Sequence, residues 1–185
     1  WNLRINDTDN ITRSDVTLAF SVEANDSFMV NVSINGSIMT QSGTTWTSVT
    51  TAGTLSCPIG AANSSCTLTA TATDIVNRQN STDLVIIIDD VPPTISDLTS
   101  NATSNQSYND EWLNFTVNAA DANLRSVTLN GTAMSNSGTF WNLTIQPSSL
   151  SCVAGTVCEL TAIATDYADN TNTTKYNLTI KTVFS

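Results

Sequence analysis

Apolar and polar residues alternate along several short stretches of the chain, and this period of two predicts β-strands. Turn-forming residues separate the stretches every 8 to 12 positions, a spacing typical of a β-sandwich rather than of alternating strands and helices. The residues expected to point into the core are Val16, Leu18, Phe20 and Val22, then Val32 and Ile34, then Cys66, Leu68, Ala70 and Ala72, then Leu84, Ile86 and Ile88. The residues expected on the opposite faces are Thr17, Ser21, Thr67, Thr69 and Thr71.

The second half of the chain repeats the first, which indicates a tandem duplication. An offset of 95 residues holds up to the first cysteine of each half, and an offset of 92 holds after the second cysteine, because the second half is three residues shorter between them. The aligned pairs include Leu18 and Leu113, Phe20 and Phe115, Trp46 and Trp141, Cys57 and Cys152, Cys66 and Cys158, and Asp74 and Asp166.

Turn and linker residues mark the organisation within and between the repeats. Asn-Gly at 35–36 and at 130–131 predicts a tight hairpin turn in each repeat, because both residue types tolerate a positive φ. The segment IIIDDVPPTIS joins the repeats, and its Pro92 and Pro93 cannot extend a central strand. We therefore predict an all-β chain of two tandem domains, 1–90 and 91–185, with the boundary near Val91.

Composition and charge restrict the possible partners. Ser and Thr number 22 and 31, whereas charged residues make up only 12% of the chain. Thr, Val and Ile favour strands, so the composition agrees with an all-β fold. The net charge of −10 repels nucleic acid and anionic lipid. No apolar stretch reaches the roughly 18 residues that span a bilayer. We expect no nucleic-acid partner and no membrane insertion.

Three stretches resemble the immunoglobulin-like repeats of prokaryotic cell-surface proteins: TATD at 71–74, AIATDYADNT at 162–171 and DDVPPTIS at 89–96. Such repeats carry a strand that ends in ATD, a turn with a following Asn and an Asp-x-Pro-Pro linker. The resemblance implies immunoglobulin-like β-sandwich domains of S-layers, adhesins or extracellular filaments, where most such modules are spacers. The chain departs from the pattern in DIVNRQN at 74–80 and in its short cysteine loops.

The four cysteines occupy matching places in the two repeats. We expect Cys57 to pair with Cys66 and Cys152 with Cys158, which indicates an oxidising compartment. Each short loop would contribute about 2–3 kcal/mol in the chain-entropy model. A zinc site is disfavoured, because the chain contains neither His nor a C-x-x-C motif.

N-glycosylation sequons are unusually frequent. The chain has 21 Asn, and with Ser and Thr at about 29% of residues chance gives roughly six sequons. The strand pattern sends Asn31, Asn114, Asn142 and Asn177 outward, while their apolar neighbours point inward. The sequence contains 14 sequons, at Asn6, Asn10, Asn25, Asn31, Asn35, Asn63, Asn80, Asn101, Asn105, Asn114, Asn130, Asn142, Asn172 and Asn177. We predict that many carry glycans on exposed strand faces.

Candidate chemistry is sparse. The chain lacks His, and paired cysteines offer no nucleophile, so we predict neither an enzyme nor a cofactor. The adjacent carboxylates at 89–90 and at 110–111 are expected to be solvated surface groups. Trp46 and Trp141 are in phase with core residues, whereas Trp1 and Trp112 are candidates for a sugar-binding platform.

Calcium is the metal that the sequence suggests most. Asp89 and Asp90 with Asp74 or Asp166 are similar to acidic clusters that stiffen some adhesin arrays. Ca²⁺ takes six to eight oxygens, however, and no EF-hand spacing is present. The alternative is that Asp74 and Asp166 accept turn hydrogen bonds, since both repeats contain them. We predict no metal site.

Two functions remain open. The first is a structural segment of a heavily N-glycosylated extracellular filament or surface layer, archaeal by resemblance, with copies of itself or neighbouring repeats as partners. The alignment matches Trp1 with Ser96, so the first repeat should lack the start of its first strand, and a neighbour's terminal strand would complete it head to tail. The alternative to that assembly is two repeats of a longer chain. The second function is an adhesin or carbohydrate-binding module with specificity in its loops.

Overall fold

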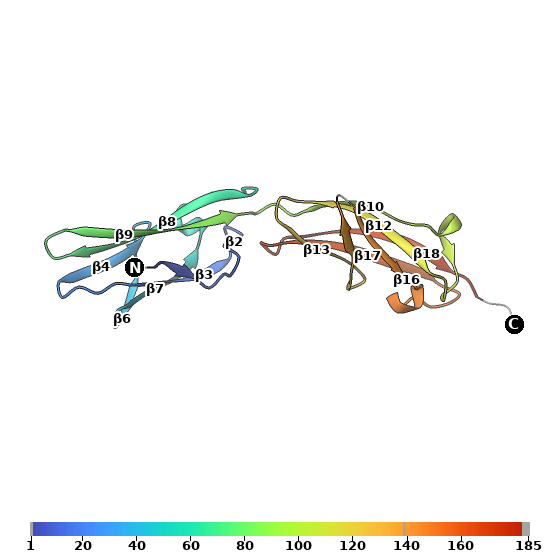
Figure 1. Cartoon of the computed structure of the whole chain (residues 1–185), viewed down its shortest axis with the longest axis horizontal. Helices are drawn as coiled ribbons and strands as arrows, with labels where there is room; N and C mark the ends of the chain where they lie inside the picture. The colour runs from blue at the N-terminus through green and yellow to red at the C-terminus, as the bar shows by residue number, and fades with distance from the viewer. Residues whose placement is uncertain (1, 139, 183–185) are drawn as a thin grey trace. The chain divides into compact units, whose positions relative to one another are not determined.

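The computed structural model describes residues 2–138 and 140–182, which form β-strands and short 3₁₀ turns. The chain divides into two compact units, Trp1–Val91 and Pro92–Ser185, called domain 1 and domain 2 below. Each is a sandwich of two β-sheets (Figure 1). The all-β prediction of two tandem immunoglobulin-like sandwiches is confirmed. Among the described residues, no helix is long and apolar enough to cross a membrane.

Domain 1 packs a four-stranded sheet, in the order β1-β3-β7-β6, against a five-stranded sheet, in the order β2-β9-β8-β4-β5. Neighbouring strands are antiparallel except β2, which runs parallel to β9. Its elements are β1 (Arg4–Ile5), β2 (Ile11–Thr12), β3 (Thr17–Glu23), β4 (Met29–Ile34), β5 (Ser37–Ile38), β6 (Thr40–Ser42), β7 (Thr45–Thr51), η1 (Gly53–Leu55), β8 (Ser64–Asp74) and β9 (Gln79–Ile88).

Domain 2 repeats this topology, with sheets in the order β10-β12-β16-β15 and β11-β18-β17-β13-β14. Its elements are β10 (Thr94–Ser100), η2 (Thr103–Asn105), β11 (Gln106–Ser107), β12 (Leu113–Ala120), β13 (Leu124–Leu129), β14 (Thr132–Ala133), β15 (Ser135–Ser137), β16 (Phe140–Ile145), η3 (Pro147–Leu150), β17 (Val157–Asp166) and β18 (Thr171–Ile180). The linker prolines lie between β9 and β10 and belong to neither strand.

Each core lies between the two sheets of its domain and consists of the alternating apolar residues. Phe20, Val32 and Leu68 are buried in domain 1, as are Phe115 and Leu160 in domain 2. Burying such side chains removes apolar surface from water and stabilises the sandwich. The predicted inward residues of the first repeat are all buried or half-buried, and the predicted outward ones are all half-buried or exposed.

Both predicted Asn-Gly turns and both predicted disulfides are present. Asn35 and Asn130 have φ values of 42° and 44°, and each Gly that follows also has a positive φ, so each pair closes a two-residue hairpin. Cys57 bonds to Cys66 and Cys152 to Cys158.

Candidate functional site

The carboxylates that close strand-end turns are structural. The Asp74 carboxylate accepts hydrogen bonds from the backbone N–H groups of Val76 and Arg78 at 2.9 and 2.8 Å. These bonds, the one from Arg78 foremost, lower the pKa of Asp74. Asp166 is fully buried and accepts bonds from the backbone and side-chain nitrogens of Asn170. The turn-forming role expected as the alternative to calcium is therefore confirmed for both residues.

Asp90 joins two loops of domain 1. Its Oδ1 accepts the backbone N–H of Ser14, and its Oδ2 accepts that of Gly60 inside the cysteine loop, both at 2.7 Å. Partial burial of this carboxylate raises its pKa, but the hydrogen bonds, led by the one from Ser14, outweigh that effect and lower the pKa overall. Asp90 thus holds two loops together, and the sequence alone did not indicate this role. The expectation that Asp89 and Asp90 are solvated surface groups was wrong, because Asp89 is buried and Asp90 is half-buried.

Two further groups of carboxylates lie in domain 2. The Glu111 carboxylate accepts hydrogen bonds from the Ser107 hydroxyl and the Tyr108 backbone N–H, so it supports its own loop. Carboxylate oxygens of Asp121 and Asp166 lie within 4.8 Å of each other in domain 2. Ca²⁺ also takes backbone carbonyl, amide and water oxygens, so these carboxylates do not test the expectation, and the absence of a metal site stays our prediction.

The sequon asparagines all reach the surface. Asn31 and Asn142 are half-buried, and the other twelve are exposed. Their distribution differs from the prediction, because six lie in strands and eight lie in turns or loops. The strand positions are Asn31, Asn80, Asn114, Asn142, Asn172 and Asn177, and the remaining positions are Asn6, Asn10, Asn25, Asn35, Asn63, Asn101, Asn105 and Asn130. Turns or loops interrupt the strands at these eight positions. The prediction that the sequons lie on strand faces therefore holds for only six of the fourteen.

The side chains of several sequon asparagines also form hydrogen bonds within their own domain. The side chain of Asn35 donates to the Leu55 carbonyl and accepts the Thr69 N–H. Its counterpart Asn130 contacts Leu150 and Thr161 in the same way. Asn6 and Asn101, also counterparts, each accept a backbone N–H from the neighbouring strand at 2.9 Å. The two-residue hairpin turn was the only sequence signal for any of these roles.

Three sequon asparagines of domain 2 are not required by the repeated fold. Asn114, Asn142 and Asn177 occupy outward positions of β12, β16 and β18. Their counterparts in domain 1 are Ala19, Thr47 and Val85, and the same strands form there without Asn. Asn31 of β4 is a fourth such position, because its counterpart in β13 is Ser126.

Aromatic residues divide into core and surface as predicted. Trp46 and Trp141 are buried, whereas Trp112 is 65% exposed. Trp1 lies outside the described residues. Tyr108 is also exposed and borders an open depression of about 460 Å³. The depression is lined by polar residues of domain 2, among them Asn101, Asp110, Glu111 and Lys181.

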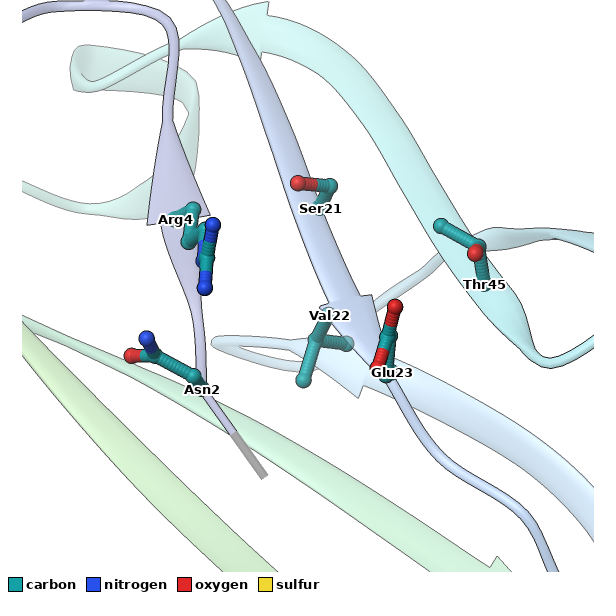
Figure 2. Close-up of a pocket in the computed structure, with 6 residues that line it drawn as sticks. All are labelled: Asn2, Arg4, Ser21, Val22, Glu23 and Thr45. Carbon is teal, nitrogen blue, oxygen red and sulfur yellow. The ribbon is translucent and has the colours of Figure 1, made fainter.

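A second cavity, of about 250 Å³, lies over the neighbouring strands β1, β3 and β7 of domain 1 (Figure 2). Asn2 and Arg4 lie on one side of it, and Ser21 and Glu23 of β3 and Thr45 of β7 lie on the other. Strand β1 pairs with β3 at two positions, whereas β10 pairs with β12 at five in domain 2.

The fold and these surfaces define a tandem immunoglobulin-like β-sandwich protein. No protein-family model matches the chain, and a comparison with curated protein sequences gives no match either. Among solved structures, the chain is similar to the fibronectin(III)-like modules of CbhA from Clostridium thermocellum. The TM-score is 0.54 at 16% identity, over 97% of this chain and 94% of that one. At this identity the likeness shows the fold alone.

Two adhesin structures also match. One is a 1.5-MDa bacterial ice-binding adhesin, with a TM-score of 0.40 and 18% identity over 97% of this chain and 63% of that one. The other is the adhesin InvE of Yersinia pseudotuberculosis, with a TM-score of 0.31 and 11% identity over 95% and 58% of the two chains. Nothing further follows from likenesses this distant.

Proposed function

We propose that this chain is a structural segment of a heavily N-glycosylated extracellular filament or surface layer, on an archaeal cell by the resemblance of its repeats. Its partners are copies of itself, joined head to tail by strand complementation, or neighbouring repeats. The observation that carries the proposal is the set of outward sequons that the fold does not need, at Asn114, Asn142 and Asn177. A glycan on such a position projects into solvent and disturbs no packing.

Glycans would compensate for a surface poor in charge. Charged residues make up 12% of the chain, against about 25% in an ordinary soluble domain. Sheet edges and apolar surface residues such as Val49 and Val85, which are 70% and 51% exposed, invite association with other chains. Bulky hydrophilic sugars on both domains would block this association and leave contacts only where the surface stays bare.

The two disulfides support an extracellular location, because such bonds persist in oxidising compartments. The net charge of −10 favours hydrated surroundings and disfavours nucleic acid as a partner. A spacer function also agrees with the structural roles of Asp74, Asp90 and Glu111, whose carboxylates accept hydrogen bonds within turns and loops.

Glycopeptide mass spectrometry on material from the source cells tests the glycan coat. We expect occupancy at Asn114, Asn142 and Asn177, and unmodified asparagines at all three would overturn the proposal. At the hairpin turn, a pair of variants separates the sequon of Asn35 from its structural hydrogen bonds. Ser37→Ala removes the sequon and keeps the Asn side chain that binds Leu55 and Thr69. Asn35→Ala removes the sequon and these hydrogen bonds together, and serves as the matched control. Electron microscopy of native material should show filaments or layers rather than isolated particles.

A carbohydrate-binding function is the second candidate, because exposed Tyr108 borders the depression on domain 2. Aromatic faces bind sugar rings, the amide groups nearby donate and accept hydrogen bonds, and the carboxylates accept them. The sequon at Asn101 lines the same depression, so a glycan there would cover it, and this favours the structural function. Binding of polysaccharide fragments that Tyr108→Ala and Trp112→Ala both abolish would instead support the second candidate.

A further inference from the structure

We propose that the fold selects which sequons are glycosylated, because it binds the amide nitrogen of some asparagines and leaves that of others unbonded. The asparagines that we expect to carry glycans are Asn6 and Asn101, and those that we expect to stay unmodified are Asn35 and Asn130. Each pair consists of counterparts in the repeat, so each domain contains one asparagine of each kind. This inference rests on the proposed function, which it deepens by naming the acceptor residues.

Exposure does not separate the two pairs, because all four asparagines are exposed. The difference lies in which atom of the side-chain amide is bonded. A glycan is attached to the nitrogen, Nδ2, whereas the oxygen, Oδ1, is kept in the product. The orientation of each amide follows from its partners, since a backbone N–H only donates and a carbonyl oxygen only accepts.

Asn35 uses both ends of its amide to hold the hairpin turn between β4 and β5. Nδ2 donates to the Leu55 carbonyl at 2.9 Å, and Oδ1 accepts the Thr69 N–H at 2.8 Å. The backbone N–H of Asn35 donates to the Thr69 carbonyl at 3.0 Å. Nδ2 must leave the Leu55 carbonyl before it can receive a sugar. This movement also disturbs the bond to Thr69, because both atoms belong to one planar amide.

Asn130 repeats this arrangement in domain 2. Nδ2 donates to the Leu150 carbonyl at 3.3 Å, and Oδ1 accepts the Thr161 N–H at 2.8 Å. The backbone N–H of Asn130 donates to the Thr161 carbonyl at 3.0 Å. The bond to Leu150 is longer than the equivalent bond in domain 1, so Nδ2 of Asn130 is the less firmly held of the two nitrogens.

Asn6 and Asn101 use only the oxygen end of the amide. Oδ1 of Asn6 accepts the Ala19 N–H, and Oδ1 of Asn101 accepts the Asn114 N–H, both at 2.9 Å. Within residues 2–138 and 140–182, Nδ2 of neither side chain donates a hydrogen bond. A sugar on Nδ2 therefore leaves the structural hydrogen bond of each side chain in place.

The transfer step explains why the state of Nδ2 matters. Nδ2 attacks the anomeric carbon of an activated glycan with a phosphate leaving group, which the cell supplies together with a transferase. The N–C bond forms, the C–O bond to phosphate breaks, and its electron pair leaves with the phosphate. A base of the transferase takes one Nδ2 proton. At Asn101 this step requires no change in the fold, whereas at Asn130 the hairpin turn must first give up hydrogen bonds.

Strand β18 contains both kinds of sequon asparagine. Nδ2 of Asn172 donates to the Pro93 carbonyl at 2.9 Å. The side chain of Asn177 makes no hydrogen bond to any residue that the structure describes. We therefore expect a glycan on Asn177 and none on Asn172.

Site-resolved glycopeptide mass spectrometry of native material tests this selection. We expect occupancy at Asn35 and Asn130 to be roughly tenfold lower than at their partners, because a structural hydrogen bond is lost at each. Ala102→Gly, expressed in the source cells, is the matched control, since it gives Asn101 the same Asn-Gly-Thr sequon as Asn130. Asn101 should stay occupied in this variant. Loss of its glycan would assign the difference to the sequon and overturn the inference.

Aspartate variants of the unglycosylated chain test the hydrogen bonds without any sugar. Asn101→Asp keeps an oxygen for the Asn114 N–H, so the melting temperature of domain 2 should stay nearly unchanged. Asn130→Asp places an oxygen against the Leu150 carbonyl and should lower that temperature by about 4–8 °C. Equal melting temperatures for the two variants would overturn the distinction between the two kinds of asparagine.

The outcomes separate this inference from the proposed function. Similar occupancy at Asn101 and Asn130 would overturn the selection and leave the glycan coat in place. Unmodified asparagines at all fourteen sequons would overturn both. Glycans on Asn101 together with an unmodified Asn130, in the unmodified chain and in Ala102→Gly, would support the selection by the fold.

Discussion

The two domains share a topology and a core but differ at their edges and loops. Phe20 and Phe115 occupy the same buried place, and each domain has one disulfide before its longest hairpin. The first strand, however, is two residues long in domain 1 and seven in domain 2. The comparison shows that the repeated pattern determines the sandwich, whereas edges and loops differ between the two domains.

The cysteine loops illustrate the same division. In domain 1 the Asp90 carboxylate binds Gly60 inside the loop and also Ser14. Its counterpart in domain 2 is Thr182, and there the loop is held by backbone bonds instead, between Gly155 and Ile180 and between Ile180 and Thr156. The cysteine loop of domain 1 is therefore held by an ionised side chain, whereas that of domain 2 is held by backbone hydrogen bonds.

The largest effect is expected from the shared core. Phe115→Ala should destabilise domain 2 by about 3–5 kcal/mol, since it leaves a cavity between the sheets. Phe20→Ala should do the same to domain 1. Phe115 also packs edge to face on Tyr176, with ring centroids 6.4 Å apart, and Phe20 has Leu84 in that place. Calorimetry should therefore show a somewhat larger loss for Phe115→Ala, and equal losses would contradict a contribution from the aromatic pair.

Removal of the disulfides should affect the two domains almost equally. The cysteines are separated by nine residues in domain 1 and by six in domain 2. Chain entropy depends weakly on loop length, so each double Cys→Ser variant should lose about 2–3 kcal/mol. Urea unfolding with a probe in each domain would measure this. A loss confined to one domain would show that its loop also carries tertiary contacts that the other lacks.

A smaller effect, limited to domain 1, is expected from Asp90→Asn. At neutral pH this variant should lose about 1–2 kcal/mol, because it weakens two hydrogen bonds to a charged acceptor. The pKa of Asp90 is lowered in the folded state, so its contribution is present above the unfolded value of about 3.8 and disappears as pH falls through the folded value. The melting temperatures of the unmodified chain and of Asp90→Asn should therefore converge as the pH falls below about 3.8. A difference that persists in acid would assign the loss to packing rather than charge.

The sequence predicted the sandwich well because the core residues recur at every second position along the strands. Residues such as Val32 and Ile34 alternate with polar neighbours, and the duplication doubled the evidence for every strand. The same periodicity separated buried Trp46 from exposed Trp112. The hairpins were predictable as well, since Asn-Gly turns follow from local backbone conformation.

The loop contacts could not be predicted, because they join residues far apart in the chain. Nothing in the local sequence of Asp90 indicates a bond to Ser14, which lies 76 positions earlier. The structural bonds of Asn6 and Asn35 were hidden for a similar reason, since a sequon looks the same whether its side chain is free or bonded.

The smallest effect is expected where the strand-end turns differ. In domain 1 the Arg78 guanidinium pairs with Asp74 at 2.9 Å, and in domain 2 the same position is Asn170. The Arg78 side chain is 80% exposed, and pairs on the surface contribute little because water and salt screen them. Arg78→Asn should therefore leave the melting temperature of domain 1 nearly unchanged at physiological salt. Asp74→Ala should lower it clearly, because two backbone N–H groups lose their acceptor. Thermal melts at low and high salt would compare them, and a large, salt-dependent loss in Arg78→Asn would mean that the ion pair, rather than the turn, stabilises this end of domain 1.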